Sequence, residues 1–162
     1  MKKQLYILLI ALCATLLAAP QALAQNAIFQ KYSDMDNDDV EFICITKSML
    51  KMLSNKDTKK KVMVNGVNIN GISDAVKVLL IINSGDPTVC KMMKDDFKTL
   101  KADPDYEMLM MIKDGMDKVI TLYNQKRQDK ELVMYIDDGI DQTFIVLTGA
   151  LNEDMVNKIL AK

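Results

Sequence analysis

The acidic run DMDNDD, residues 34–39, places four aspartates in six positions. Carboxylate oxygens at such spacing are the ligands of an EF-hand calcium loop, in which Asp34, Asp36 and Asp38 would hold the first, third and fifth positions. However, the sixth position is an aspartate where the sharp turn requires glycine, and the twelfth is Ile45 where a bidentate glutamate is required. We therefore interpret the run as a polar turn that ends a helix and starts a strand.

Two other metal sites remain open alternatives. The acidic run would form a composite calcium site if it met the aspartates of the last predicted hairpin, which are Asp137, Asp138 and Asp141. Twelve of the 13 methionines follow residue 24, and thioethers bind copper(I). Met93 lies on an apolar helical stripe, whereas Met108 and Met110 alternate on one face of a predicted strand, so we interpret these methionines as core. A partly exposed methionine surface that contacts a partner is the alternative.

The chain contains no histidine, which argues against most common catalytic chemistry. Ser/His/Asp and Cys/His nucleophilic sites and the usual catalytic zinc sites all need that residue. The string SMLK, residues 48–51, matches S-x-x-K of penicillin-recognising enzymes, but their other motifs are missing and an exposed helical turn explains it. We expect no enzyme, no cofactor and no resident metal, with a hydrolase that uses carboxylates alone as the remaining catalytic alternative.

The N-terminus has the pattern of a secretory signal peptide. Two lysines precede an apolar run over 5–19, and the small-residue pattern Ala22-Leu23-Ala24 comes before Gln25. We expect cleavage between Ala24 and Gln25, so that residues 1–24 are the signal peptide and 25–162 form the exported domain. Processing as a lipoprotein at Cys13 is disfavoured because Leu12 stands where a small side chain is needed.

Charge and hydropathy limit the classes of partner that we expect for the exported part. After residue 24 the chain keeps 19 basic and 22 acidic side chains, a net charge of about −3, and has no long basic face. This composition argues against nucleic-acid binding. The apolar stretch 78–82 is far shorter than the roughly 20 residues of a membrane helix, so we expect no transmembrane segment after cleavage.

Two cysteines, Cys44 and Cys90, remain in a compartment that permits disulfides. Cys44 shares a strand face with Phe42, and Cys90 belongs to a helical stripe with Phe97, so both could face one core. A Cys44–Cys90 disulfide and two buried free thiols are both compatible with this pattern.

The periodicity of apolar residues predicts an α+β domain. It has one mostly antiparallel sheet of about six strands with a C-terminal meander, and helices packed on one face. The predicted strands are 40–45, 77–83, 105–113, 117–125, 130–137 and 142–149, and the predicted helices are 25–33, 47–53, 87–102 and 153–161. Residues 54–76 stay ambiguous, because Asn65-Gly66 indicates a hairpin whereas GISDAV could open a helix.

Three segments carry a resemblance to a known family: FQKYSDMDNDDVEFICITKSMLKML, YEMLMMIKDGMDKVITLY and ELVMYIDDGIDQTFIVLTGAL. In their order and pattern they resemble domain of unknown function 4252, a family of exported proteins of Gram-negative bacteria, over nearly all of 29–160. The resemblance implies an exported α+β protein of the periplasm or cell envelope, without an established activity, cofactor or catalytic residue. It also suggests a role in envelope sensing. The asparagine-rich stretch 54–72 departs from the family pattern.

These observations favour an exported, non-catalytic envelope domain that binds another protein or a peptide through a sheet edge or a methionine-lined surface. The alternative is an envelope-sensing accessory that binds a small ligand or metal ion, and a carboxylate-based hydrolase ranks third. Lys47, at a strand-to-helix turn, and Tyr106 with Glu107, at a strand start, are the expected binding-surface residues. Their alternative roles are a turn-capping lysine and a cross-strand edge pair.

Overall fold

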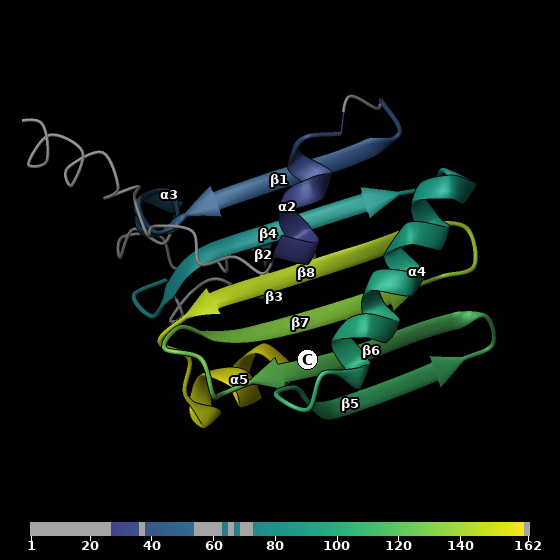
Figure 1. Cartoon of the computed structure of the whole chain (residues 1–162). Coiled ribbons are helices and arrows are strands. Elements are labelled where there is room, and N and C mark those ends of the chain that lie inside the picture. Colours follow the sequence, from purple (N-terminus) through teal and green to yellow (C-terminus); the bar gives the residue numbers. More distant parts are fainter. Residues whose placement is uncertain (1–26, 36–37, 54–62, 65–66, 69–72, 161–162) are drawn as a thin grey trace, which may run out of the picture.

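The computed structural model describes residues 27–35, 38–53, 63–64, 67–68 and 73–160 (Figure 1). The helices are α2 (Ala27–Ser33), α3 (Lys47–Leu53), α4 (Pro87–Ala102) and α5 (Glu153–Leu160). The strands are β1 (Val40–Thr46), β2 (Met63–Val64), β3 (Val67–Asn68), β4 (Val76–Ser84), β5 (Glu107–Asp114), β6 (Asp117–Asn124), β7 (Lys130–Asp137) and β8 (Gln142–Gly149). The predicted signal peptide and its cleavage site lie outside the described residues. No helix within the described ranges is long and apolar enough to span a membrane.

A six-stranded sheet in the order β1-β4-β8-β7-β6-β5 forms the centre of the molecule, and all five pairings are antiparallel. Strands β5 to β8 form a meander through short turns, as the sequence predicts. After β4, helix α4 carries the chain across the sheet to the far edge, where β5 begins (Figure 1). The α+β class and the six-stranded antiparallel sheet are thus confirmed.

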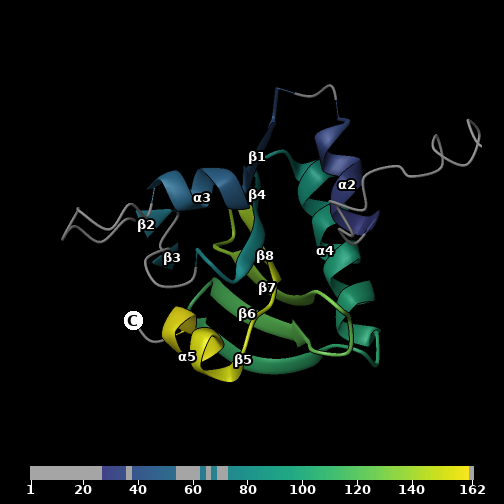
Figure 2. The same cartoon turned by 90° about the vertical axis from the view of Figure 1, so that its left-hand side faces the viewer.

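The helices cover both faces of the sheet, so the prediction that they pack on one face is wrong (Figure 2). Side chains from α2 and α4 join one core cluster, whereas side chains from α3 and α5 join a second cluster on the opposite face. The reason lies in the inner strands, where β4 reads VKVLLIINS and buries consecutive residues. Consecutive strand residues point to opposite faces, and both faces therefore need cover.

Aromatic rings dominate the core under α2 and α4. Phe144 of β8 is fully buried, with its ring centroid 5.4 Å from that of Phe29 in α2 and 5.2 Å from that of Tyr135 in β7. Tyr135 also stacks on Phe97 of α4, with ring centroids 4.4 Å apart. These contacts tie both helices to the middle of the sheet, because such ring pairs add to the free energy of area burial.

Helix α4 begins as its sequence predicts. Asp86 is the N-cap and accepts hydrogen bonds from the backbone N–H groups of Thr88 and Val89, each at 2.9 Å. Pro87 occupies the first helical turn, where its missing N–H costs nothing. The helix ends at Ala102, before the predicted break at Asp103-Pro104.

The ambiguous stretch 54–76 contains a short hairpin. Strands β2 and β3 pair antiparallel, with Val64 opposite Val67, which matches the turn signal between them. Residues 73–75 form a turn instead of the alternative helix, and β4 begins directly after them at Val76.

Close backbone approach at the end of β8 favours glycine at position 149. A Cβ atom at this position would lie 2.2 Å from the carbonyl oxygen of Ala75 and 2.9 Å from the backbone nitrogen of Lys77. The register of β4 and β8 also shifts beside this residue. We expect Gly149→Ala to lower the free energy of unfolding by about 1–3 kcal/mol, because backbone atoms must move apart.

Urea denaturation of the purified protein measures this effect. The matched control is Ala150→Ser, since the neighbouring side chain is exposed and its replacement should stay within about 0.5 kcal/mol. Equal stabilities of the two variants would contradict the proposed close approach.

Candidate functional site

The strand β5 forms one edge of the sheet and is exposed on both of its faces. It pairs with β6 on one side, and in the described part of the chain no strand pairs with its other side. Four of its apolar side chains are 38–49% exposed, namely Met108, Leu109, Met111 and Ile112. An eight-residue edge strand with unpaired backbone groups and exposed apolar side chains is a template for pairing with another chain.

Two turns extend this apolar surface at one end of the sheet. Met116, in the turn after β5, is 76% exposed, and its Cε lies 2.6 Å from where a Cβ of Gly139 would stand. Ile140, which follows Gly139 in the turn between β7 and β8, is 80% exposed. We call these six exposed side chains the β5 surface: Met108, Leu109, Met111, Ile112, Met116 and Ile140.

A register shift within β5 determines which way its side chains point. Met108 pairs with Leu122 and Met110 with Thr121, so Leu109 has no cross-strand partner in β6. Leu122 and Thr121 are consecutive and point to opposite faces, and Met108 and Met110 therefore do so too. The prediction that these two methionines share one buried face is wrong, whereas Met93 is fully buried as expected.

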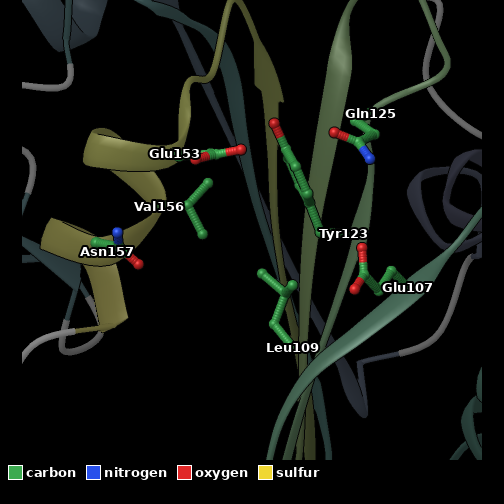
Figure 3. Close-up of a pocket in the computed structure, with 7 residues that line it drawn as sticks. All are labelled: Glu107, Leu109, Tyr123, Gln125, Glu153, Val156 and Asn157. Atoms are coloured by element: carbon green, nitrogen blue, oxygen red, sulfur yellow. The ribbon is translucent and has the colours of Figure 1, made fainter.

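A pocket of about 270 Å³ opens between β5, β6 and α5 on the second face (Figure 3). Its lining residues are Glu107, Leu109, Tyr123, Gln125, Glu153, Val156 and Asn157. In Figure 3 the carboxylate of Glu153 extends from α5 toward the Tyr123 ring, while Glu107 and Leu109 lie on the opposite wall. The lining is therefore mixed: Leu109, Val156 and the Tyr123 ring are apolar, whereas the other four residues are polar, and two of these are carboxylates.

Local structure fixes both carboxylates at this pocket. Asn152 caps α5 by accepting a hydrogen bond from the Met155 backbone N–H at 2.9 Å, as the sequence predicts, and this places Glu153 in the first helical turn. The Tyr123 hydroxyl donates to the Leu151 carbonyl oxygen at 3.3 Å, which ties β6 to the chain just before α5. Glu107 is the first residue of β5.

The three predicted binding-surface residues do not meet. Glu107 is exposed and lines the pocket, whereas Lys47 begins α3 beside β1, at the opposite edge of the sheet. Tyr106 is buried, and its hydroxyl is hydrogen-bonded to the carboxylate of Glu131, which has no exposed surface. The Nη1 of Arg127 lies 3.9 Å from the second oxygen of that carboxylate. Tyr106 is therefore a core residue.

The described part of the chain does not bring the acidic residues considered for calcium into a group that could hold a metal ion. Asp34 and Asp38 are exposed, Asp36 lies outside the described residues, and the described ranges contain no group of three or more acidic or cysteine side chains that could hold a metal ion. Asp138 instead accepts hydrogen bonds from the backbone N–H groups of Asp141 and Ile140 within its turn. These bonds lower the pKa of Asp138.

The two cysteines are not joined by a disulfide. Cys44 lies on β1 opposite Leu80 and is exposed, while Cys90 is buried and its thiol donates to the carbonyl oxygen of Ser84 at 3.2 Å. Leu80 and Ser84 are four residues apart on β4, a separation of about 13 Å along a strand. A disulfide needs Cα atoms within about 7 Å, so the proposed bridge does not fit.

The family model described as domain of unknown function (DUF4252) matches residues 32–159. The chain belongs to this family. The match spans the whole six-stranded sheet, the β5 surface and the pocket residues up to Asn157. No curated protein and no solved structure matches the chain.

The candidate site of this DUF4252 domain is therefore at β5. Its groups are backbone N–H and C=O groups at an open edge, apolar side chains on both faces, and two carboxylates beside the pocket. From the sequence, a sheet edge or a methionine-lined surface is expected to bind a partner, but this expectation does not place both features on one strand. The signal was present in EMLMMIKD, where five apolar residues follow one another without alternation.

The cysteines provide a first test of the structure. We expect iodoacetamide to modify Cys44 in the folded protein and to leave Cys90 unmodified until denaturant is added. Cys90 is buried, and burial together with Asp141 and Asp86 raises the pKa of its thiol, which reduces the reactive thiolate. Peptide mapping by mass spectrometry measures both sites, and a peptide that contains a Cys44–Cys90 disulfide would contradict the structure.

The buried Tyr106 hydroxyl provides a second test. Tyr106→Phe removes a donor to the buried Glu131 carboxylate and should lower the free energy of unfolding by about 1–3 kcal/mol. Tyr123→Phe is the matched control, because its hydrogen bond is long at 3.3 Å and should contribute less. Urea denaturation compares the variants, and equal losses would contradict a larger contribution from the Tyr106–Glu131 hydrogen bond than from the long bond of Tyr123.

Proposed function

We propose that this protein is exported to the cell envelope and binds an extended segment of another protein there, without catalysis. The open edge of β5 carries the proposal. An added strand would pair with its free backbone groups and cover the four exposed apolar side chains of β5. Export is supported by the signal-like pattern of residues 1–24.

The amino-acid composition of β5 fits a strand that a partner covers better than it fits a strand that stays exposed to solvent. Proteins that leave an edge free protect it with β-bulges, inward-pointing charges, proline or very short strands. The register shift at Leu109 is one such feature. However, β5 is eight residues long, has five consecutive apolar residues from Met108 to Ile112, and carries charged residues only at its ends. Such an edge is an aggregation hazard unless a partner covers it.

The other edge strand, β1, offers less to a partner. Along β1, Ile43 points to the opposite face from Phe42 and Cys44. Phe42 is partly buried against the first core cluster, and Ile43 is partly buried against the second. The contrast between the two edges favours β5 as the side at which another chain binds.

A second candidate function is favoured by the pocket. A small ligand that carries a positive charge would contact the carboxylates of Glu107 and Glu153, and the protein would then report envelope state by binding it. We rank this function second because it rests on the pocket alone, whereas the leading proposal rests on both the open edge of β5 and its exposed apolar side chains.

A photo-crosslinking amino acid at Met111 tests the leading proposal in living cells. We expect one dominant envelope protein to crosslink there, because the side chain is 49% exposed at the proposed interface. The same amino acid at Met52 in α3, which is 73% exposed beside the opposite edge, is the matched control and should not capture that protein.

The interface is then weakened by Met111→Lys combined with Ile112→Lys. We expect at least about a tenfold loss of affinity for the captured protein, since two apolar contacts would be replaced by charges, with little loss of stability. Unchanged affinity, or crosslinks at Met111 that join only two copies of this chain, would overturn the proposal.

A further inference from the structure

The pocket borders the strand edge at which a partner would bind. Glu107 and Leu109 belong to β5 itself, so a segment paired with β5 would pass beside these two pocket residues. Paired strands lie about 4.8 Å apart, and every second side chain of the added strand points to the face that holds α5. One side chain of the docked segment is therefore directed toward the pocket.

The charge of the pocket is of one sign. Glu107 and Glu153 are exposed carboxylates, and none of the seven lining residues is basic. Neither glutamate forms an ion pair with a residue in the described ranges, whereas eight other carboxylate–cation contacts occur there. A cation brought into the pocket would thus not have to displace a basic side chain of any described residue.

The walls of the pocket fit the remainder of a basic side chain. Leu109, Val156 and the Tyr123 ring provide apolar surface for the methylene stem of lysine or arginine, and the ring face also attracts a cation. Amide oxygens of Gln125 and Asn157 are further acceptors at the rim. The volume of about 270 Å³ is just below the range of about 300–1,000 Å³ that is typical of small-molecule pockets, which suits one side chain.

We infer that this pocket receives a lysine or arginine side chain from the segment that pairs with β5. The inference rests on the proposed function, and it adds a specificity rule. Backbone pairing and the β5 surface provide affinity for extended apolar segments in general, while Glu107 and Glu153 select those with a basic residue at one position.

Selection of random peptides displayed on phage tests the rule with the full chain. Peptides are selected on the purified protein and then sorted by whether Met111→Lys combined with Ile112→Lys abolishes their binding. We expect the peptides that depend on β5 to share lysine or arginine at one position within an alternating apolar pattern.

The pocket is then examined with synthetic copies of a selected peptide. Glu107→Gln combined with Glu153→Gln should weaken the lysine or arginine peptide about five- to tenfold, measured by fluorescence anisotropy at low salt. The same double variant should not change the affinity for a peptide copy in which methionine replaces the basic residue. The effect of the glutamate substitutions is then coupled to the basic residue of the peptide. Asp154→Asn is the matched control, since it removes a carboxylate from the same helical turn outside the pocket.

The possible outcomes separate the two proposals. Peptides that depend on β5 without a shared basic position, or without coupling to Glu107 and Glu153, would overturn the pocket rule and leave the proposed function in place. Absence of any peptide that depends on β5 would count against both. Equal loss of affinity in the Asp154→Asn variant would show a general charge effect and would also overturn the rule.

Discussion

Burial of both faces of one antiparallel sheet is the constraint on which the rest of this structure depends. In β4, β7 and β8 nearly every residue is buried, so apolar side chains project from each face of the sheet. A single helical layer would leave half of them in water, at a cost of roughly 25 cal/mol for each Å² of apolar surface. The four described helices are therefore divided between the two faces, and each pair encloses a separate core cluster (Figure 2).

This division leaves one strand with little cover. Helix α4 packs over the middle of the first face, and its buried residues contact the central aromatic cluster around Tyr135. Helix α5 has only eight residues, and its buried Val156 reaches the pocket beside β5. Four helices of limited length thus cover the inner strands, and β5 stays exposed on both faces. The exposure of the proposed binding edge therefore follows from where the four helices cover the two core clusters.

The sequence predicts the elements well because their signals are local. The cap at Asp86, the apolar run of β4 and the turn residues of the meander each depend on a few neighbouring side chains. Strand order is not local, and for that reason the sequence could not show that Lys47 and Glu107 lie at opposite edges. The same limit explains Cys44, whose apolar neighbours suggest burial although its strand is at the edge.

The errors at Met108 and Met110 have a different cause. A period of two assigns both to one face, but the register shift at Leu109 turns the strand between them. Five successive apolar residues carry no alternation from which such a shift could be detected. Tyr106 was likewise expected at the surface because it begins a strand, and only the contact with Glu131, 25 residues later in the chain, makes it part of the core.

That buried contact also bears on the proposed site. Tyr106 is held between the sheet and α4 immediately before β5, and its hydroxyl is bonded to Glu131 of β7. The start of β5 is therefore fixed to the core, although the strand itself is exposed. Glu107 follows directly, so the backbone of this pocket residue is held by the same contact. Because less conformational freedom is lost when a backbone that is already fixed binds, a segment that docks as proposed would benefit from this end of β5.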